Sequence, residues 1–330
     1  MKAFLHRDYG SPDLLKVEDI EKPTAGDHEV LVGVRAASVN PLDWRVMRGR
    51  PFLIRLMMGG LRKPKPTRLG ADVAGLVEAV GRNVTQFRPG DEVFGGCRGA
   101  FAEYVCVSED KLALKPANLS FEDAAAVPVA ALSALQSLRD TGRIRQGQKV
   151  LVDGASGGVG TFAVQIAKSF GVEVTAVCST RKMDTARSLG ADHVIDYSRE
   201  DFTRSGQRYD LIVAANAYHS IFNYRRALSQ GGMYVLVGGG WSQILQALLL
   251  GPLLSLIGSK KMRFFMAKID KTDLVLLKDL IEAGKVVPVI DRRHPLSELA
   301  EALGYCEEGH AKGKVVITVE HRAPTGFERE

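Results

Sequence analysis

A glycine-rich run at residues 154–160, GASGGVG, has the residue types best suited to binding a phosphate group. It follows an apolar stretch at 149–153 and precedes apolar residues at helical spacing from 158 to 170, as a turn between a strand and a helix does. Such a turn lets the backbone approach a pyrophosphate, and the helix N-terminus adds unpaired N–H groups and a positive dipole end. A turn that serves only packing is the alternative, which this setting disfavours. The run therefore predicts a dinucleotide-binding loop, whose expected contacts are Ala155, Ser156, Gly157, Gly158 and Val159.

The residues after the next predicted strand discriminate between NADH and NADPH. NAD-binding sites usually place an Asp or Glu about 20 residues beyond the loop, where it binds the ribose hydroxyls. The corresponding run, CSTRK at 178–182, has no carboxylate but has hydroxyls and two cations. We expect Ser179, Arg181 and Lys182 to hold a 2′-phosphate, because a guanidinium offers forked donors to phosphate oxygens. Ser179 or Thr180 capping a helix would also suit this run, and both uses can hold together.

The middle third of the sequence alternates between strand and helix patterns. Short apolar strands are predicted at 149–153, 172–178, 193–196, 210–214, 233–237 and 262–266, and helices at 158–170, 182–189 and 218–228. Strands separated by helices imply right-handed crossovers, which build a parallel, doubly wound sheet. The fold class is therefore α/β for this part of the chain.

The first third is different in character. Alternating strands at 29–36, 73–80 and 101–107 are joined by Gly and Pro turns and predict a β-rich domain. Residues 285–319 return to short strands with one helix, so we expect them to fold back onto that domain. The predicted organisation is a β-rich segment at 1–122, an inserted nucleotide-binding domain at 123–267 and a return segment of the β-rich domain at 268–330.

Composition limits the possible partners. The 330 residues are 45% hydrophobic and 25% charged, as in ordinary soluble proteins, and carry a formal net charge of +6. The densest basic stretch, 62–68, lacks the aromatic residues that would stack on bases, so we expect no nucleic acid partner. The positive net charge of the chain is compatible with an anionic cofactor. The N-terminus becomes charged too early for a signal peptide and the four cysteines are dispersed, which predicts a cytoplasmic protein.

Residues 244–257 form the most apolar stretch of the chain. A bilayer span takes about 20 residues, whereas this stretch is shorter and is interrupted by Gln246, Gly251 and Pro252. We therefore expect no integral membrane span. A buried or subunit-contact helix is favoured over attachment to a membrane surface.

In the order and spacing of its motifs the chain resembles the medium-chain dehydrogenase/reductase superfamily along nearly its whole length. The motifs are LGADVAG at 69–75, RPGDEV at 88–93, GAFAEYV at 99–105, AAAVP at 124–128, ASGGVG at 155–160, LGAD at 189–192 and GKVV at 313–316. The ASGGVG and STR runs look more like the quinone and enone reductases than the alcohol dehydrogenases. The resemblance implies a Rossmann domain inserted into a GroES-like domain. It also implies a homodimer in which the edge strand at 262–266 pairs with its copy, which would satisfy that edge.

The stretches where zinc alcohol dehydrogenases of this superfamily bind their metal hold other residues here. The stretch that would provide the first cysteine is SVNPLD at 38–43, the His-Glu stretch is GAD at 70–72, and the four-cysteine lobe is missing. Catalytic zinc needs three protein ligands and structural zinc four, so we expect no metal. Without a Lewis acid, the resemblance implies NADPH-dependent hydride transfer to a quinone or an α,β-unsaturated carbonyl, whose enolate needs only hydrogen-bond donors.

The same resemblance places three residues near the reacting groups. Asn40 is the expected donor to the substrate carbonyl or the nicotinamide, Asp43 an orienting group and Trp44 a wall with an N–H. A turn-forming role suits Asp43 equally well. Phe52, Leu53 and the 56–66 loop would line the substrate pocket. Further cofactor contacts implied by the family are Ser133, Tyr197, Asn216, Gly238, Gly239 and Lys314.

Two other functions stay open at this stage. One is an NADPH-binding protein with little catalysis, as among the crystallin and vesicle-trafficking relatives. The other is an NADP-dependent reductase of the alcohol or aldehyde dehydrogenase type. The sequence has no charge cluster that favours a macromolecular partner, so the enzyme is the favoured interpretation.

Overall fold

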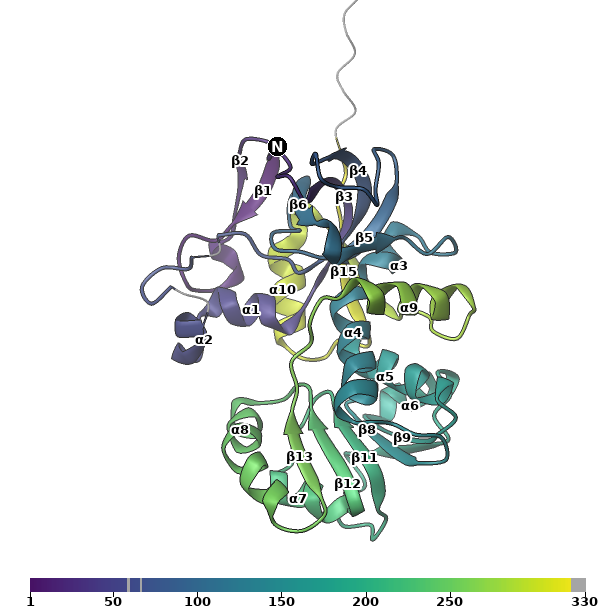
Figure 1. The fold of residues 1–330 in the computed structure, drawn as a ribbon. Helices are drawn as coiled ribbons and strands as arrows, with labels where there is room; N and C mark the ends of the chain where they lie inside the picture. Colours follow the sequence, from purple (N-terminus) through teal and green to yellow (C-terminus); the bar gives the residue numbers. More distant parts are fainter. Residues whose placement is uncertain (58–59, 66, 322–330) are drawn as a thin grey trace, which may run out of the picture. The chain divides into compact units, whose positions relative to one another are not determined.

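The computed structural model describes residues 1–57, 60–65 and 67–321, with the backbone alone for Leu53 and Met57. The chain divides into two compact units. The first comprises Met1–Pro128, Asp270–Val275 and the C-terminal segment from Ile290, and the second comprises Val129–Ile269 and Leu276–Val289 (Figure 1). The return segment was expected from 268, but residues 276–289 belong to the second unit. Gln165 of that unit holds them, because its side chain bonds the backbone N–H and C=O of Val287 at 2.8 and 3.0 Å.

A mainly antiparallel sheet of seven strands forms the first unit. Its order is β14 (Ile290–Pro295), β15 (Lys314–Thr318), β3 (Glu29–Val39), β4 (Asp72–Val80), β5 (Glu92–Gly96) and β7 (Leu112–Leu114), and β6 (Tyr104–Ser108) also pairs with β3. β3 is buried along most of its length, since it is paired with three other strands. The pairing of β15 with β3 returns the C-terminal segment to the N-terminal domain, as the sequence predicted.

Short helices surround this sheet. They are α1 (Pro41–Arg48), α2 (Phe52–Met57), α3 (Phe121–Ala125) and α10 (Leu299–Glu307), and β1 (Lys2–Leu5) with β2 (Lys16–Asp19) forms a separate hairpin. α1 starts directly after β3, where Ser38 stands opposite Asp72, the first residue of β4. The same end of β3 therefore carries the start of α1 and the start of β4.

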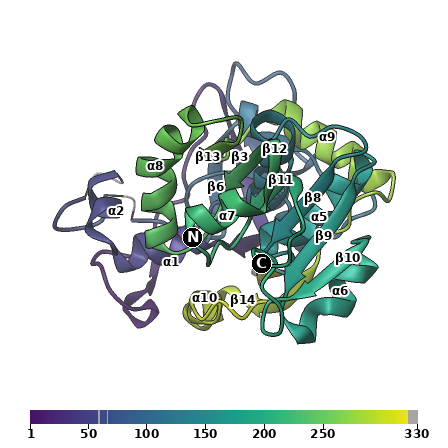
Figure 2. The same ribbon diagram turned by 90° about the horizontal axis from the view of Figure 1, so that it is seen from below.

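The second unit contains a sheet of six parallel strands. Its order is β10 (His193–Asp196), β9 (Glu173–Cys178), β8 (Lys149–Asp153), β11 (Tyr209–Ala214), β12 (Leu228–Leu236) and β13 (Lys261–Phe264). Counted along the chain from β8, this is the order 3-2-1-4-5-6 of the dinucleotide-binding Rossmann fold. The order reverses between β8 and β11, and ligands bind at such a reversal, outside the carboxyl ends of the strands. Figure 2 shows the strands side by side.

Helices connect or follow the parallel strands. They are α4 (Pro128–Gln136), α5 (Gly158–Ser169), α6 (Met183–Ser188), α7 (Ile221–Ala227), α8 (Trp241–Leu256) and α9 (Lys271–Glu282). α7 starts at Ile221, later than the predicted 218, because Ser220 caps it by accepting a hydrogen bond from the N–H of Asn223. The apolar stretch at 244–257 lies within and just after α8, which is buried on one face only.

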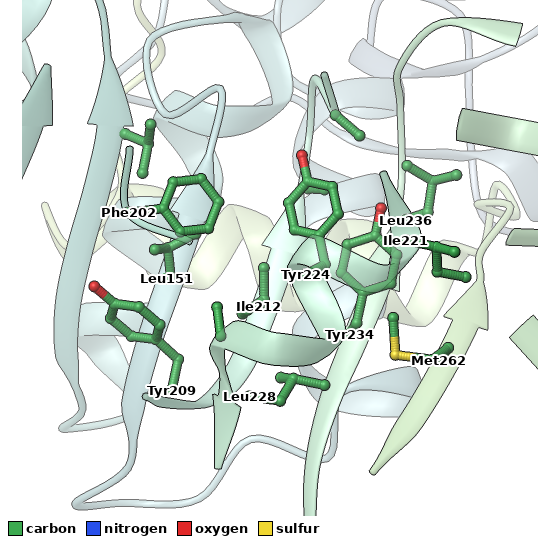
Figure 3. Close-up of a cluster of buried hydrophobic side chains, with 14 of the residues drawn as sticks. Leu151, Phe202, Tyr209, Ile212, Ile221, Tyr224, Leu228, Tyr234, Leu236 and Met262 are labelled. Carbon is green, nitrogen blue, oxygen red and sulfur yellow. The ribbon is translucent and has the colours of Figure 1, made fainter. Parts of the chain in front are cut away.

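One face of the parallel sheet packs against α7 and α8 in a continuous apolar cluster (Figure 3). Leu151, Ile212 and Leu236 contribute from three neighbouring strands, and each is fully buried. Tyr224 of α7 stacks on Tyr234 of β12, with ring centroids 4.6 Å apart. This cluster fixes the strands whose carboxyl ends carry the ligand-binding loops.

Replacing Leu151 by Ala should lower the free energy of unfolding by about 2–5 kcal/mol, because it removes buried methyl groups and leaves a cavity. Leu249→Ala is the matched control, since Leu249 is 67% exposed on the same unit and surface changes usually stay within about 0.5 kcal/mol. Urea unfolding followed by circular dichroism measures both. Equal effects of the two substitutions would contradict the packing described for the cluster.

Candidate functional site

The glycine loop is held by close backbone approaches that only glycine permits. Gly154 has a φ of +77°, and a Cβ there would lie 2.9 Å from the backbone nitrogen of Asn216. A Cβ at Gly160 would lie 2.1 Å from the carbonyl oxygen of Gly154. The loop therefore packs tightly between the end of β8, the start of α5 and the chain after β11.

The N-terminus of α5 stays open on the other side of this loop. Gly157 precedes the helix and no side chain caps it. A Cβ at Gly157 would meet only the carbonyl oxygen of Gly154, at 3.6 Å. The N–H groups of a first helical turn have no partner within the helix, so this end can receive an anionic group. The predicted contacts Ala155, Ser156, Gly157, Gly158 and Val159 all lie in this loop or first turn.

The loops after β8, β11 and β12 come together at the carboxyl end of the sheet. The N–H of Asn216 donates to the carbonyl oxygen of Asp153 at 3.3 Å, and that of Ala217 donates to Gly238 at 2.9 Å. Ala217 and Gly239 also form a parallel β-bridge. Three of the predicted cofactor residues, Asn216, Gly238 and Gly239, are thus joined to the glycine loop at the reversal of strand order.

A buried acid–phenol pair supports this loop. Asp153 ends β8, and its carboxylate accepts a hydrogen bond from the hydroxyl of Tyr224. Burial raises the pKa of Asp153 to about 7, although the bonds from Tyr224 and from the Gly154 N–H oppose the shift. Because folding favours the protonated carboxyl, its contribution makes the protein less stable as pH rises from about 4 to about 7. The sequence analysis missed this pair, since the two residues are 71 positions apart.

The run after β9 keeps its hydroxyl and cation available. Ser179 precedes a short 3-10 turn, Thr180–Lys182, but its side chain makes no capping hydrogen bond. Thr180 instead donates to the carboxylate of Asp196 at the end of β10. Arg181 is exposed and has no ion pair with any described carboxylate. The capping alternative for Ser179 therefore has no support in the structure, while Asp196 is a neighbouring carboxylate that the sequence analysis missed.

Hydrogen bonds already occupy the acceptor oxygens of Asp196. Besides Thr180, the backbone N–H and the hydroxyl of Ser198 donate to it at 3.0 and 2.7 Å. These bonds hold the pKa of Asp196 below its ordinary value. The carboxylate is thus engaged with its own loop.

Two further predicted contacts, Tyr197 and Ser133, also belong to the second unit. Tyr197 directly follows β10, its N–H donates to the carbonyl oxygen of Cys178 at 3.1 Å, and its ring is half exposed. Tyr218 brings a second half-exposed ring within 5.7 Å of it. Ser133 of α4 is buried and donates its hydroxyl to the carbonyl oxygen of Val129 at 2.6 Å, a bond within its own helix.

In the first unit, Lys314 and Asp72 form a buried ion pair with Asn40 between them. The ammonium lies 3.2 Å from the Asp72 carboxylate and donates to Asn40 Oδ1 at 2.7 Å. Asn40 Nδ2 in turn donates to Asp72 Oδ2 at 2.8 Å, and the Ser38 hydroxyl donates to the same oxygen at 2.5 Å. All four residues are more than nine-tenths buried. Lys314, expected beside the cofactor, thus has its charge neutralised within its own domain.

Asp43 caps α1 and ties it to the chain before β4. Its two carboxylate oxygens accept hydrogen bonds from the N–H of Asn40 at 2.8 Å and of Gly70 at 3.1 Å. Burial raises the pKa of Asp43 to about 7 in spite of these bonds. The orienting and turn-forming roles considered for Asp43 therefore coincide in one geometry.

Trp44 follows on α1, and its indole N–H has no hydrogen-bond partner among the described residues. The guanidinium of Arg45 lies 5.2 Å from its ring centroid. Of the expected pocket wall, Phe52 is exposed, whereas the side chain of Leu53 and residues 58, 59 and 66 lie outside the described part of the chain. Trp44 is thus a donor whose hydrogen is not used within its own domain.

Residues of the two stretches where zinc ligands would be expected, 38–43 and 70–72, serve this network instead. Asp72 accepts a hydrogen bond from the Ser38 hydroxyl and pairs with Lys314, and Cys97 lies near Asp72. Burial, followed by the charges of Asp72 and Asp43, raises the pKa of Cys97, which disfavours the thiolate that zinc binds. Elsewhere in the described residues the one cluster of three possible ligands is His294, Glu298 and Glu301, and both glutamates are exposed.

Two family models match the chain, an alcohol dehydrogenase GroES-like domain at residues 26–117 and a zinc-binding dehydrogenase domain at 189–317. The 2-methylene-furan-3-one reductase of Solanum lycopersicum is 36% identical over 96% of this chain and 79% of its own length. The chain belongs to the medium-chain dehydrogenase/reductase superfamily.

Other similar members of this superfamily are alkenal or quinone oxidoreductases by name. The chloroplastic NADPH-dependent alkenal/one oxidoreductase of Arabidopsis thaliana is 34% identical, over 96% of this chain and 79% of its own length. The solved quinone oxidoreductase of Coxiella burnetii is 29% identical, with a TM-score of 0.85 over 97% of this chain and 99% of that one. This superfamily member is an oxidoreductase of the zinc-free, quinone oxidoreductase-like branch, with a GroES-like and a Rossmann domain.

The glycine loop yields a matched pair of substitutions. Gly160→Ala should destabilise the protein by about 1–3 kcal/mol, because the new methyl group cannot avoid the Gly154 carbonyl. Gly157→Ala should leave stability nearly unchanged and weaken NADPH binding, because its Cβ points to open space where a phosphate approaches. Thermal unfolding without cofactor and fluorescence titration with NADPH separate the two effects. Unchanged NADPH affinity in Gly157→Ala would remove the loop from the cofactor site.

The buried ion pair yields a second prediction. Lys314→Met should cost about 3–5 kcal/mol, because it leaves the Asp72 carboxylate buried without a countercharge. The double variant Lys314→Met with Asp72→Asn should recover part of that loss, since no unpaired charge remains. Arg7→Met breaks the exposed Arg7–Glu18 pair in the same unit and should cost at most about 1 kcal/mol. A double variant less stable than Lys314→Met alone would show that the charges are not coupled.

Proposed function

We propose that this protein transfers hydride from NADPH to the β-carbon of an α,β-unsaturated carbonyl or to a quinone, without a metal. The observation that carries the proposal concerns two residues after β9. Arg181 has no ion pair with a described carboxylate, and the Ser179 hydroxyl makes no capping hydrogen bond. Both lie about 20 residues beyond the glycine loop in the sequence, where a 2′-phosphate is recognised. The alkenal/one and furanone reductases among the relatives, by their names, act on conjugated carbonyl compounds. A conjugated acceptor suits a chain whose stretches at 38–43 and 70–72, where zinc ligands would be expected, hold no cysteine or histidine.

The bound cofactor would supply the hydride, and the chain's own groups would supply binding and orientation. In this proposal the α5 N-terminus holds the pyrophosphate, and Ser179, Arg181 and Lys182 hold the 2′-phosphate. Tyr197 borders the adenosine.

Asn40 positions the start of α1 in this proposal, since Asp72 and Lys314 already engage its amide. That leaves the N–H of Trp44 as the donor for a substrate oxygen, because a buried N–H without a partner favours any acceptor that reaches it. Lys314 acts through the side chain of Asn40, and Asp43 acts through the backbone N–H of Asn40.

Steady-state assays test the function directly. NADPH oxidation should be readily measured with alkenals, enones or quinones and should be much slower with saturated aldehydes. The reason is that only conjugated acceptors form a stabilised enolate or quinol when they accept the hydride. Preference for saturated aldehydes would favour the alcohol dehydrogenase type instead. NADPH binding without turnover of any of these acceptors would favour a binding protein with little catalysis.

Assembly and location complete the proposal. β13 is an edge strand of the parallel sheet, and its pairing with a second copy would satisfy its free backbone groups in a homodimer. Light scattering measures the mass of the assembly in solution and so distinguishes a dimer from a monomer. Cytoplasmic location stays a prediction, since the relatives include chloroplastic proteins by name.

Cofactor preference can be tested at single residues. Arg181→Ala should weaken NADPH binding about 10- to 150-fold and leave NADH binding nearly unchanged, because one charge-assisted hydrogen bond to the phosphate is lost. Ser179→Asp should invert the preference, since a carboxylate repels the phosphate and accepts hydrogen bonds from both ribose hydroxyls of NADH. The ratio of kcat/KM values for the two cofactors cancels general damage to the fold. Equal losses with both cofactors would leave the NADPH assignment without support.

A further inference from the structure

Helix α8 carries an apolar face that no part of the described chain covers. Ala247, Gly251 and Ser255 face the sheet and are buried. The exposed side holds Leu245 and, three and four residues later, Leu248 and Leu249, then Leu253 and Leu256, with Ile257 directly after the helix. Leu249, Leu253 and Leu256 are 67%, 58% and 83% exposed. The sequence predicted a buried or subunit-contact helix at 244–257, and in the single chain only one side of it is buried.

The stretch of sequence that contains α8 has no acidic residue. Between Asp210 and Asp270 the sequence has no Asp or Glu, but it has six cations, Arg225, Arg226, Lys260, Lys261, Arg263 and Lys268. Their summed charge equals the formal net charge of the whole chain, +6, so the positive and negative charges of the remaining residues cancel. The excess positive charge of the protein is thus confined to the segment that presents the leucines.

The cations at the C-terminal end of α8 form no ion pair with a carboxylate of the described residues. Lys260 donates to the carbonyl oxygen of Arg225 at 3.0 Å, and Arg225 donates to that of Ile257 at 2.6 Å. Arg208, on the loop before β11, donates to the carbonyl oxygens of Gly206 and Gln207, both at 2.9 Å. Burial, and then the charges of Arg208 and Arg225, lower the pKa of Lys260. Like charges held together without a carboxylate favour an anionic partner.

A leucine face flanked by unpaired cations matches an anionic lipid surface. Such helices lie in the interface, with apolar side chains among the acyl chains and cations at the phosphate groups. No helix among the described residues is long and apolar enough to cross a membrane. A second copy fits this face less well, because a two-fold contact would oppose two acid-free, cationic segments. A homodimer formed by pairing two β13 edge strands would be held by backbone groups of β13 and would not require these leucines.

We propose that the exposed leucines of α8 and the cations beside its C-terminus, Arg208, Arg225 and Lys260, form a docking surface for anionic membranes. The proposal is independent of the substrate and the cofactor. It makes the protein a reversible, peripheral partner of lipid, because one short helix inserts shallowly and salt screens its charges. A lipophilic quinone or alkenal would dissolve in the same lipid bilayer.

Vesicle flotation with the full chain tests the proposal. The protein should float with phosphatidylcholine vesicles that contain phosphatidylserine, much less with phosphatidylcholine alone, and less as salt increases. The double variant Leu249→Glu with Leu253→Glu should lose at least about tenfold in apparent affinity, because it places carboxylates on the inserted face. Arg208→Gln with Lys260→Gln should reduce binding and weaken its salt dependence.

A matched control distinguishes this face from general hydrophobicity. Leu14→Glu with Leu114→Glu changes two leucines that are 50% and 49% exposed in the first unit, and should leave lipid binding unchanged. NADPH binding and thermal unfolding verify that each variant is folded. Failure of the wild-type protein to float with either vesicle overturns the proposal. So does an α8 leucine variant that binds lipid normally, or one that changes only from dimer to monomer, which would make this face a subunit contact.

Discussion

The first domain depends on one buried electrostatic contact, between the ammonium of Lys314 and the carboxylate of Asp72. Two charges removed from water are stable only where each is paired and the remaining donors and acceptors are used. Here Asn40 and Ser38 complete the set, so the pair fixes the end of β3, the start of β4 and the start of β15 relative to one another. Because α1 begins at the same place, the orientation of Trp44 depends on it as well.

The same contact explains how a zinc-centred fold can do without zinc. A metal bound by Cys, His and Glu side chains would organise this corner through its own charge. In this chain a lysine supplies the positive charge and an aspartate the negative one, and the corner is organised internally. The exchange changes the chemistry, since an ammonium committed to three oxygen atoms cannot polarise a substrate as an open metal site does.

Local features of the fold could be predicted from the sequence, and long-range partnerships could not. The glycine loop was predictable because its backbone conformation and close contacts demand glycine at set positions. The strands β8 and β10 were placed correctly because a short apolar run in a parallel sheet carries its own signal. Nothing in the sequence indicates that Tyr224 donates to Asp153, or that Lys314 meets Asp72, because such pairs arise from topology. The apolar stretch at 244–257 predicted a buried or subunit-contact helix, since hydrophobicity on all sides of a helix cannot reveal which side meets the sheet.

The 242 residues that separate Asp72 from Lys314 have a consequence for synthesis. The chain leaves the ribosome from its N-terminus, so β3 and β4 emerge long before β15 can pair with them. Until then the β15 side of β3 is an unpaired edge and the Asp72 carboxylate lacks its countercharge. Most of the Rossmann domain, in contrast, is contiguous and can fold as it emerges. The nucleotide-binding half can therefore complete its fold before the GroES-like half, and the nascent GroES-like half is the part that needs protection from aggregation.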